Sequence, residues 1–514
     1  MDVESHKNIA KAAGIIALAT IFCRIAGLGR EVITANFFGT ALVYDAFLIA
    51  FMIPNFLRGL FAEGALSTAF IPVFTGYVTT EKKEETEKIA SIAFTLSLLA
   101  TLSLVILVIL GIFISSRFFH FSAKVVLILN LLKVTLPYLI LISLAAVVMG
   151  ILNSYQHFVT PAFAPIMLDL CWIGAIFFLC PLFGESLEKR IFGLATGVLI
   201  GGLGQFLIQL PALKRRNLRI RFNFNFRHPA IRRMVILLAP SVIGVAVTPI
   251  NILVDSFLAI KLGPGMVSSL WYANRLMQLP LGIFGVAMAT ATLPTLSGYF
   301  AKGEIGKLKG TLSFAIRNTL FIIIPSSVGL ILLRRPIISL FFQRGLFNTL
   351  SAENTAFALL FYALGLFAYA ASIIVVRGFY SIQDTKTPVK VGLFSILANV
   401  IFDLILMVPL KQGGIALSTA LVGMANLAIL SFILAKRLKG LDGKKIFSSF
   451  LQTVFISGLM GILVWFSLFF CRRAAMPVLN SRFALVFIPA IIGIVSYLLF
   501  SHLRGREEIR SLRA

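Results

Sequence analysis

The sequence contains few charged residues. Asp, Glu, Lys and Arg together make up 13% of its 514 residues, and 59% of the residues are hydrophobic. Soluble proteins carry about 25% charged residues. The mean hydropathy is +0.97, so a soluble globular domain is excluded and we expect the chain to lie in a lipid bilayer.

Catalytic and metal-binding motifs are also missing from the sequence. It has no HExxH, no GxSxG and no P-loop, and its 4 cysteines stand apart in apolar stretches. The 5 histidines fall in predicted loops or at the ends of apolar stretches. We therefore expect a protein that is not an enzyme and that binds no metal and no organic cofactor.

Long apolar stretches dominate the chain instead. A membrane-spanning helix needs about 20 mostly apolar residues. Several stretches are longer than one straight crossing and contain glycine or proline (Gly27, Gly29, Pro54, Pro280), so we expect tilted or broken helices that line a cavity. The sequence predicts an all-α integral membrane protein with about fourteen transmembrane helices, at 8–37, 42–76, 86–115, 124–152, 160–182, 190–213, 230–260, 265–299, 306–332, 352–379, 387–409, 413–437, 446–470 and 480–502.

The basic residues indicate the orientation. There are 46 Lys and Arg against 20 Asp and Glu, an excess that would suggest nucleic acid in a soluble protein, but most of them flank predicted spans. We count 28 on the side of the termini and 12 on the other side. The positive-inside rule then predicts cytoplasmic termini and no nucleic-acid partner. We expect the most basic connection, 214–233, to contact anionic membrane lipids.

The chain repeats itself weakly at an offset of about 220–227 residues. Gly39 corresponds to Gly263 and Pro72 to Pro294. Two longer stretches also correspond, 155–161 (YQHFVTP) with 382–388 (IQDTKTP) and 210–216 (LPALKRR) with 432–438 (FILAKRL). A repeat in one orientation predicts two six-helix lobes around a central cavity, with a substrate site between them. The expected parts are an N-lobe (1–213), a basic linker (214–229), a C-lobe (230–437), and two further helices with a cytoplasmic tail (438–514).

Six basic residues fall inside predicted spans, where an ionisable group is costly and indicates a functional site. Four are arginines beside helix-breaking residues: Arg24, Arg30, Arg58 and Arg275. A cavity lined with guanidinium groups favours an anion with several oxygens, such as phosphate or pyrophosphate. Ion pairs with Glu31, Asp45 and Glu63, or extension of the arginines to the membrane surface, are alternative interpretations. For the other two, Lys133 and Arg317, we expect such extension.

A second polar group lies in the predicted C-lobe. Asp255, Asn399 and Asp403 stand in apolar stretches, and residues 399 and 403 are four apart on one helical face. With the hydroxyl of Thr419 they could hold a Na⁺ ion or share a proton. Hydrogen bonds that join helices are the alternative interpretation.

Five stretches together resemble the MurJ (MviN) family of lipid II flippases, which belongs to the multidrug/oligosaccharidyl-lipid/polysaccharide exporter superfamily. They are RIAGLGRE (24–31), 45–72, 272–294, FQRGLF (342–347) and RGFYSIQDTKTPVK (377–390). The resemblance covers essentially the whole chain. Where the family usually has Asp after the second arginine of the first helix, this chain has Glu31.

The resemblance implies a bacterial inner-membrane flippase that carries the undecaprenyl-pyrophosphate-linked peptidoglycan precursor by alternating access. The membrane potential, or Na⁺ or H⁺ at Asp255, Asn399 and Asp403, could drive it, and the cell-wall synthesis machinery is a candidate partner. The resemblance also implies cavity roles for the four arginines and for Asp45, and a lipid-tail groove formed by the last two helices. A polysaccharide-lipid flippase or a drug/cation antiporter of the same superfamily is the alternative.

Overall fold

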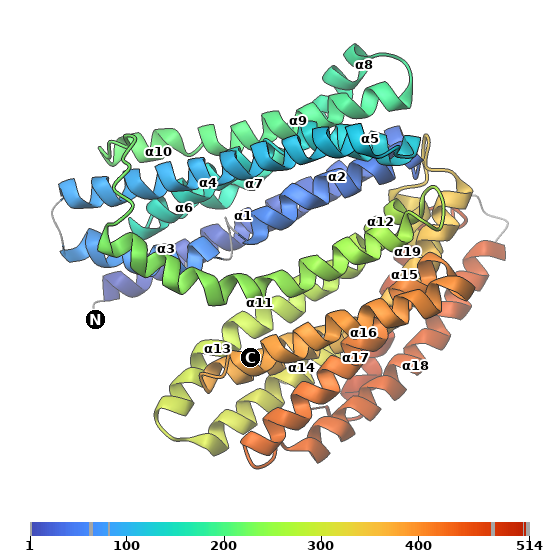
Figure 1. Cartoon of the computed structure of the whole chain (residues 1–514). Coiled ribbons are helices and arrows are strands. Elements are labelled where there is room, and N and C mark those ends of the chain that lie inside the picture. The colour runs from blue at the N-terminus through green and yellow to red at the C-terminus, as the bar shows by residue number, and fades with distance from the viewer. Residues whose placement is uncertain (1–2, 61–64, 81–82, 474–477, 507, 510–514) are drawn as a thin grey trace. The chain divides into compact units, whose positions relative to one another are not determined.

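The computed structural model describes residues 3–60, 65–80, 83–473, 478–506 and 508–509. Throughout this part of the chain the regular elements are helices, and no strand occurs (Figure 1). Eleven of these helical segments are long and apolar enough to cross a membrane. The three other predicted spans coincide with α1, with α2 followed by α3, and with α11. The prediction of an all-α protein with about fourteen spans is confirmed.

The chain forms two compact units, Met1–Leu253 and Val254–Ala514. The first unit contains α1 (Val3–Phe38), α2 (Leu42–Arg58), α3 (Ala65–Thr80), α4 (Lys83–Phe118), α5 (Ala123–Thr135), α6 (Tyr138–Ser154), α7 (Val159–Gly174), the π-helical turn η2 (Ala175–Leu179), α8 (Cys180–Phe183), α9 (Leu187–Leu207), α10 (Leu210–Arg215) and most of α11 (Pro229–Ala259).

The second unit begins within the last turns of α11. Its further elements are α12 (Met266–Pro280), the π-helical turn η3 (Leu281–Gly285), α13 (Val286–Ala301), α14 (Ile305–Phe341), α15 (Thr349–Ser381), α16 (Lys386–Leu410), α17 (Gln412–Arg437), α18 (Gly443–Arg473) and α19 (Ala484–Leu503).

The internal repeat is visible in the backbone of each unit. Gly39 after α1 and Gly263 after α11 both have positive φ, at 55° and 129°. Gln156 (57°) and Gln383 (62°) share this rare conformation 227 residues apart, as do Asn217 (52°) and Lys439 (53°) 222 residues apart. Residues other than glycine seldom adopt positive φ, so the two non-glycine pairs at the predicted offsets are strong evidence for duplication.

Helix breaks were predicted at the glycines of α1, at Pro54 and at Pro280, and the helix changes only after Pro280. α1 runs continuously through Gly27 and Gly29, and α2 continues past Pro54 to Arg58. Glycine only weakens a helix, and in a membrane neighbouring side chains can satisfy the backbone groups that a proline frees. After Pro280 the helix does change, into the π-helical turn η3.

Close packing in the first unit depends on a glycine stripe of α9. Gly193, Gly197 and Gly201 recur every fourth residue, which places them on one face. A Cβ atom at Gly193 would lie 2.7 Å from the Cα of Cys180, and one at Gly197 would overlap the side chain of Ala175. Small residues at this spacing let membrane helices approach to backbone contact.

Gly197→Ala is expected to lower the stability of the protein by about 1–3 kcal/mol, because an added methyl group must push η2 away from α9. Gly111→Ala is the matched control, since a Cβ atom at this position of α4 would meet nothing within 4 Å. Thermal unfolding of both variants in one detergent tests the expectation. Equal midpoints would show that the contact between α9 and η2 is not tight.

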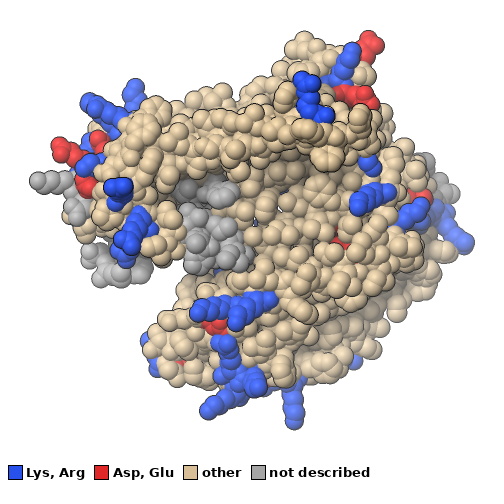
Figure 2. Space-filling model, in the orientation of Figure 1, with Lys and Arg blue, Asp and Glu red and all other residues tan. Residues whose placement is uncertain are grey.

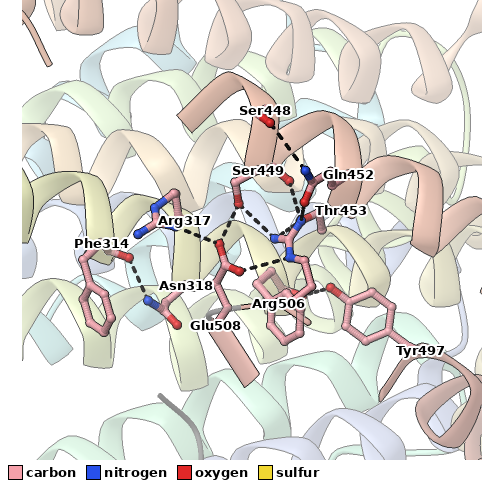
Figure 3. A network of polar contacts seen from close by, with 11 residues as sticks. Phe314, Arg317, Asn318, Ser448, Ser449, Gln452, Thr453, Tyr497, Arg506 and Glu508 are labelled. Carbon is pink, nitrogen blue, oxygen red and sulfur yellow. Dashed lines mark hydrogen bonds and ion pairs between the residues drawn. The ribbon is translucent and has the colours of Figure 1, made fainter. Parts of the chain in front are cut away.

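The segment after α19 is fixed to the second unit by a buried polar cluster (Figure 3). Arg506 donates five hydrogen bonds of 2.9–3.2 Å, one to Glu508 and four to acceptors on Ser449, Gln452 and Thr453 of α18. Glu508 also pairs with Arg317 of α14, at 3.3 Å. Arg317 was expected to extend to the membrane surface. It instead pairs with a carboxylate from a sequence-distant segment.

Candidate functional site

Arg30 of α1 lies at the centre of the polar site in the first unit. Only 7% of its surface is exposed. Its Nη1 donates to Asp169 Oδ1 of α7 at 2.9 Å, and its Nη2 donates to Glu31 Oε1 at 2.7 Å. Hydrogen bonds between charged groups are about twice as strong as neutral ones. The guanidinium group therefore links α1 to α7 inside the membrane.

The ring of Trp172 covers the same guanidinium group. The central carbon of the guanidinium group lies 4.6 Å from the centre of this ring, and Trp172 is fully buried. Trp172 donates to the hydroxyl of Thr34 at 3.0 Å, and that hydroxyl donates to the Arg30 carbonyl at 2.7 Å. Within the described part of the chain, the buried Nε of Arg30 has no hydrogen-bond partner. Nε is thus the one guanidinium nitrogen of Arg30 that donates no hydrogen bond to this part of the chain.

The spacing of residues on α1 explains this geometry. Cys23, Gly27, Arg30 and Thr34 follow the i, i+4, i+7, i+11 pattern of one helical face. Cys23 contacts the Ala162 carbonyl, and a Cβ atom at Gly27 would lie 3.8 Å from Asp169. This stripe packs against α7. Arg24 is one residue off the stripe, rotated by about 100°, and it is half-buried.

Asp169 is the functional candidate that the sequence analysis missed. It is an acidic residue in the apolar stretch PAFAPIMLDLCWIG of α7, and it is buried. The rule that an ionisable residue inside a span indicates a functional site would have selected it. Asp169 thus carries the same sequence signal as the four arginines and the C-lobe acids.

The remaining predicted residues of the arginine group lie elsewhere. Asp45 is fully buried in the first turn of α2, and Arg58 is half-buried in its last turn. Thirteen residues of helix separate them by about 20 Å, so they do not pair with each other. Glu63 lies outside the described residues. Arg275 belongs to the second unit, where its guanidinium carbon lies 4.3 Å from the ring centre of Trp271.

The second unit brings the other predicted polar group together. Asp255 comes from α11, Asn399 and Asp403 from α16, and Thr419 from α17. The amide nitrogen of Asn399 donates to Asp255 at 2.8 Å and to Asp403 at 2.9 Å. Thr419 donates to the other oxygen of Asp255 at 3.4 Å. Three helices thus meet at two carboxylates.

These carboxylates have the chemistry of a cation or proton site. Among the described residues, no Lys, Arg or His forms an ion pair with Asp255 or Asp403, and both acids are buried. Oδ1 of Asn399 and Oδ1 of Asp403 are buried without a hydrogen-bond partner in the described part of the chain. A half-turn of the Asn399 amide would place an oxygen between the two carboxylates. Na⁺ and similar hard cations favour such oxygen ligands.

Comparison with known proteins identifies the family. A family model described as "Lipid II flippase MurJ" matches residues 34–480. The "Probable lipid II flippase MurJ" of Vibrio cholerae is 35% identical, with 84% of this chain and 83% of that protein covered. A structure titled "Lipid II flippase MurJ, inward closed conformation" superposes with a TM-score of 0.80 at 30% identity, covering 96% of this chain and 99% of that one.

A more distant structural match agrees in fold. An inward-facing multidrug resistance transporter of the MATE family superposes with a TM-score of 0.67 at 18% identity, covering 84% of this chain and 99% of that one. At this identity the match shows a shared arrangement of helices and nothing about the substrate. The length of the family match, the identity to its members and the close superposition all agree, and the chain belongs to the lipid II flippase MurJ family of multi-pass membrane proteins.

Proposed function

We propose that this chain is a lipid II flippase, which carries the undecaprenyl-pyrophosphate-linked peptidoglycan precursor from the inner to the outer leaflet of the bacterial cytoplasmic membrane by alternating access. The observation that carries the proposal is the match to the MurJ family along residues 34–480. Guanidinium groups inside the membrane add a chemical reason, because their planar fork fits phosphate oxygens. Transport leaves the substrate chemically unchanged, so the protein acts as a carrier and not as an enzyme.

The arginines have different parts in this proposal. Arg24 and Arg58 of the first unit and Arg275 of the second unit are half-buried, and we assign to each of them a contact with phosphate oxygens of the substrate. Arg30 is held by Glu31 and Asp169, so a pyrophosphate reaches it only by displacing one of these carboxylates. Such an exchange of anions gives substrate binding a direct effect on the link between α1 and α7.

The positive-inside asymmetry supports an orientation with both termini in the cytoplasm. In this orientation the headgroup enters from the cytoplasmic side, and the polyprenyl tail stays in lipid. The pair α18 and α19 exposes many large apolar side chains, among them Phe455, Trp465, Ile491 and Val495. We assign the lipid-tail groove to this pair.

A polysaccharide-lipid flippase is the competing function, since its substrate also carries a lipid-linked phosphate. An antiporter for cationic drugs fits less well, because its cavity should be acidic, whereas Arg24, Arg58 and Arg275 are half-buried cations inside the predicted spans. Cells depleted of their own lipid II flippase distinguish these functions. We expect the wild-type chain to restore growth, and alanine at Arg24, Arg30 and Arg275 together to prevent it although the protein is still inserted in the membrane. Growth with the triple variant would contradict the arginine assignment.

The carboxylate pair is the proposed coupling site for Na⁺ or H⁺. Asp255→Asn or Asp403→Asn should reduce lipid II flux under an imposed cation gradient at least about tenfold. The reason is that a neutral amide neither takes up and releases a proton as a carboxylate does nor balances the charge of a cation. Separate Na⁺ and H⁺ gradients across vesicles identify the ion.

Asp384→Asn is the matched control for the coupling site, since Asp384 lies in the loop between α15 and α16 and pairs with Arg437. Its flux should respond to the gradient as the wild type does. A gradient response that survives in both Asp255→Asn and Asp403→Asn would remove the coupling role from this pair.

A further inference from the structure

The connection between α10 and α11 follows α4 in a regular way. Backbone N–H groups of Arg219, Arg221 and Asn223 donate to side chains of α4, at 3.2, 3.0 and 3.0 Å. The acceptors are Glu87, Ser91 and Thr95, which are four residues apart on one helical face. Four residues of helix rise about 6 Å, and two residues of extended chain span about 6.6 Å. The two spacings match, so residues 219–223 lie along α4.

After Asn223 the chain turns back to the start of α4. The side chain of Asn223 accepts the N–H of Asn225, and the N–H of His228 donates to the Asn225 carbonyl. His228 then contacts Glu85 Oε1 at 2.7 Å through Nε2, while its Nδ1 accepts the N–H of Ala230. Residues 217–228 thus form a loop, here called the dipping loop, whose two ends lie near the first turns of α4 and whose tip lies near Thr95.

The level of this tip relative to a membrane can be read from α4. The last charged residue at this end of the helix is Lys88, and the first large apolar side chain exposed on its surface is Leu99. Large apolar side chains are exposed along α4 from Leu99 to Phe118, as expected of a helix surface that faces lipid. Thr95 lies between these two levels, so the tip of the dipping loop reaches the boundary between headgroups and hydrocarbon.

The side chains of the dipping loop fall into three groups that fit this position at the membrane boundary: buried apolar residues, exposed aromatic residues at the tip and exposed arginines on the arms. Leu218 and Ile220 pack into the core cluster that includes Ile89 and Ala90 of α4. Phe222 and Phe224, on either side of Asn223, are 68% and 66% exposed. Arg219, Arg221 and Arg227 are exposed on the two arms that lead to the tip. Aromatic rings at the hydrocarbon boundary and cations at the headgroup level are typical of interfacial membrane segments.

The charge of the surrounding segment is of one sign. Residues 214–233 contain eight Lys and Arg and no Asp or Glu, and all eight are exposed. Figure 2 shows Lys and Arg side chains gathered at the end of the first unit where α10 lies. The neighbouring acids Glu85 and Glu87 of α4 already accept hydrogen bonds from the loop itself.

We propose that the dipping loop is an anionic-phospholipid site, in which Phe222 and Phe224 enter the cytoplasmic leaflet and Arg219, Arg221 and Arg227 bind the headgroup phosphates. The inference rests on the proposed cytoplasmic orientation of the termini. A soluble polyanion such as nucleic acid would meet the arginines but would leave the two rings in water. The phospholipid accounts for both features.

Native mass spectrometry of the purified full-length protein measures how much phosphatidylglycerol it retains. This measurement tests whether the three arginines bind headgroup phosphates. Arg219→Gln/Arg221→Gln/Arg227→Gln should weaken apparent phosphatidylglycerol affinity by up to about 100-fold. The control Lys302→Gln/Lys444→Gln/Lys445→Gln removes the same charge from exposed positions of the second unit and should change the affinity by less than about threefold. Equal retention by both triple variants, or tighter binding of an oligonucleotide than of phosphatidylglycerol, would overturn the proposal.

The depth of the rings is tested without removing any charge. Phe224→Trp in nanodiscs should add fluorescence that lipids brominated high on the acyl chain quench, relative to the wild-type background of 3 tryptophans. An added tryptophan that emits as in water and escapes quenching would contradict insertion. Lipid II flux is a separate measurement: its absence in the wild type would refute the proposed transport function and leave these two results unaffected.

Discussion

We expect Arg30→Ala to abolish lipid II transport and to lower the free energy of unfolding by about 3–5 kcal/mol, the loss that follows when one partner of a buried ion pair is removed. The substitution leaves Glu31 and Asp169 buried without their shared cation. It also removes the guanidinium group from the face of Trp172. The measurements are the thermal midpoint in detergent and lipid II flux in vesicles.

Arg24→Ala separates binding from stability. Arg24 is half-buried and one residue off the stripe that packs against α7, so its loss should change stability by less than about 1 kcal/mol. Transport should still fall, because the cavity loses a phosphate-binding cation. If Arg24→Ala destabilised the protein as much as Arg30→Ala, the distinction between the two arginines would be wrong.

Arg506→Ala should also cost about 3–5 kcal/mol, because it removes five hydrogen bonds and leaves Glu508 with Arg317 as its remaining cation (Figure 3). The expected consequence is release of the C-terminal segment from α18. Arg504→Ala is the matched control, since this neighbouring arginine is exposed and lies over Phe455. Limited proteolysis of the C-terminus and the thermal midpoint measure both variants.

The same cluster predicts a dependence on pH. Burial alone would raise the pKa of Glu508, but hydrogen bonds from its own N–H and from Ser449, together with the charges of Arg506 and Arg317, outweigh burial and lower the pKa below its ordinary value. A carboxyl with a lowered pKa stabilises the folded state above its unfolded pKa of about 4.3 and loses this contribution as the pH falls. Glu508→Gln should therefore flatten the loss of stability below about pH 5. An unchanged acid profile would contradict the assignment.

The helical architecture could be predicted because membrane spans are marked by composition alone. The order of spans, the internal repeat and the shared face of Asn399 and Asp403 all follow from local spacing. Asp255 comes from a different helix. The prediction that Asp255 lies beside Asn399 and Asp403 depended on one assumption, that isolated acids in apolar helices contact other polar side chains.

Other contacts had no signal of this kind. Arg506 and Glu508 follow the last span, where charged residues usually face water, and their burial depends on acceptors that α18 presents. The dipping loop is held by backbone N–H groups, which are the same for every sequence. The pairing of Arg30 with Asp169 depends on the packing of α1 against α7, and spacing within one helix does not show which helix will lie beside it.

Flux of labelled lipid II across vesicles that contain either the purified wild-type chain or Arg24→Ala tests the central claim most directly. The account predicts that the wild type moves lipid II across the bilayer unaltered and that Arg24→Ala, inserted and folded to the same extent, moves at least about tenfold less. Absence of flux with the wild type, chemical conversion of lipid II, or equal flux with Arg24→Ala would contradict it.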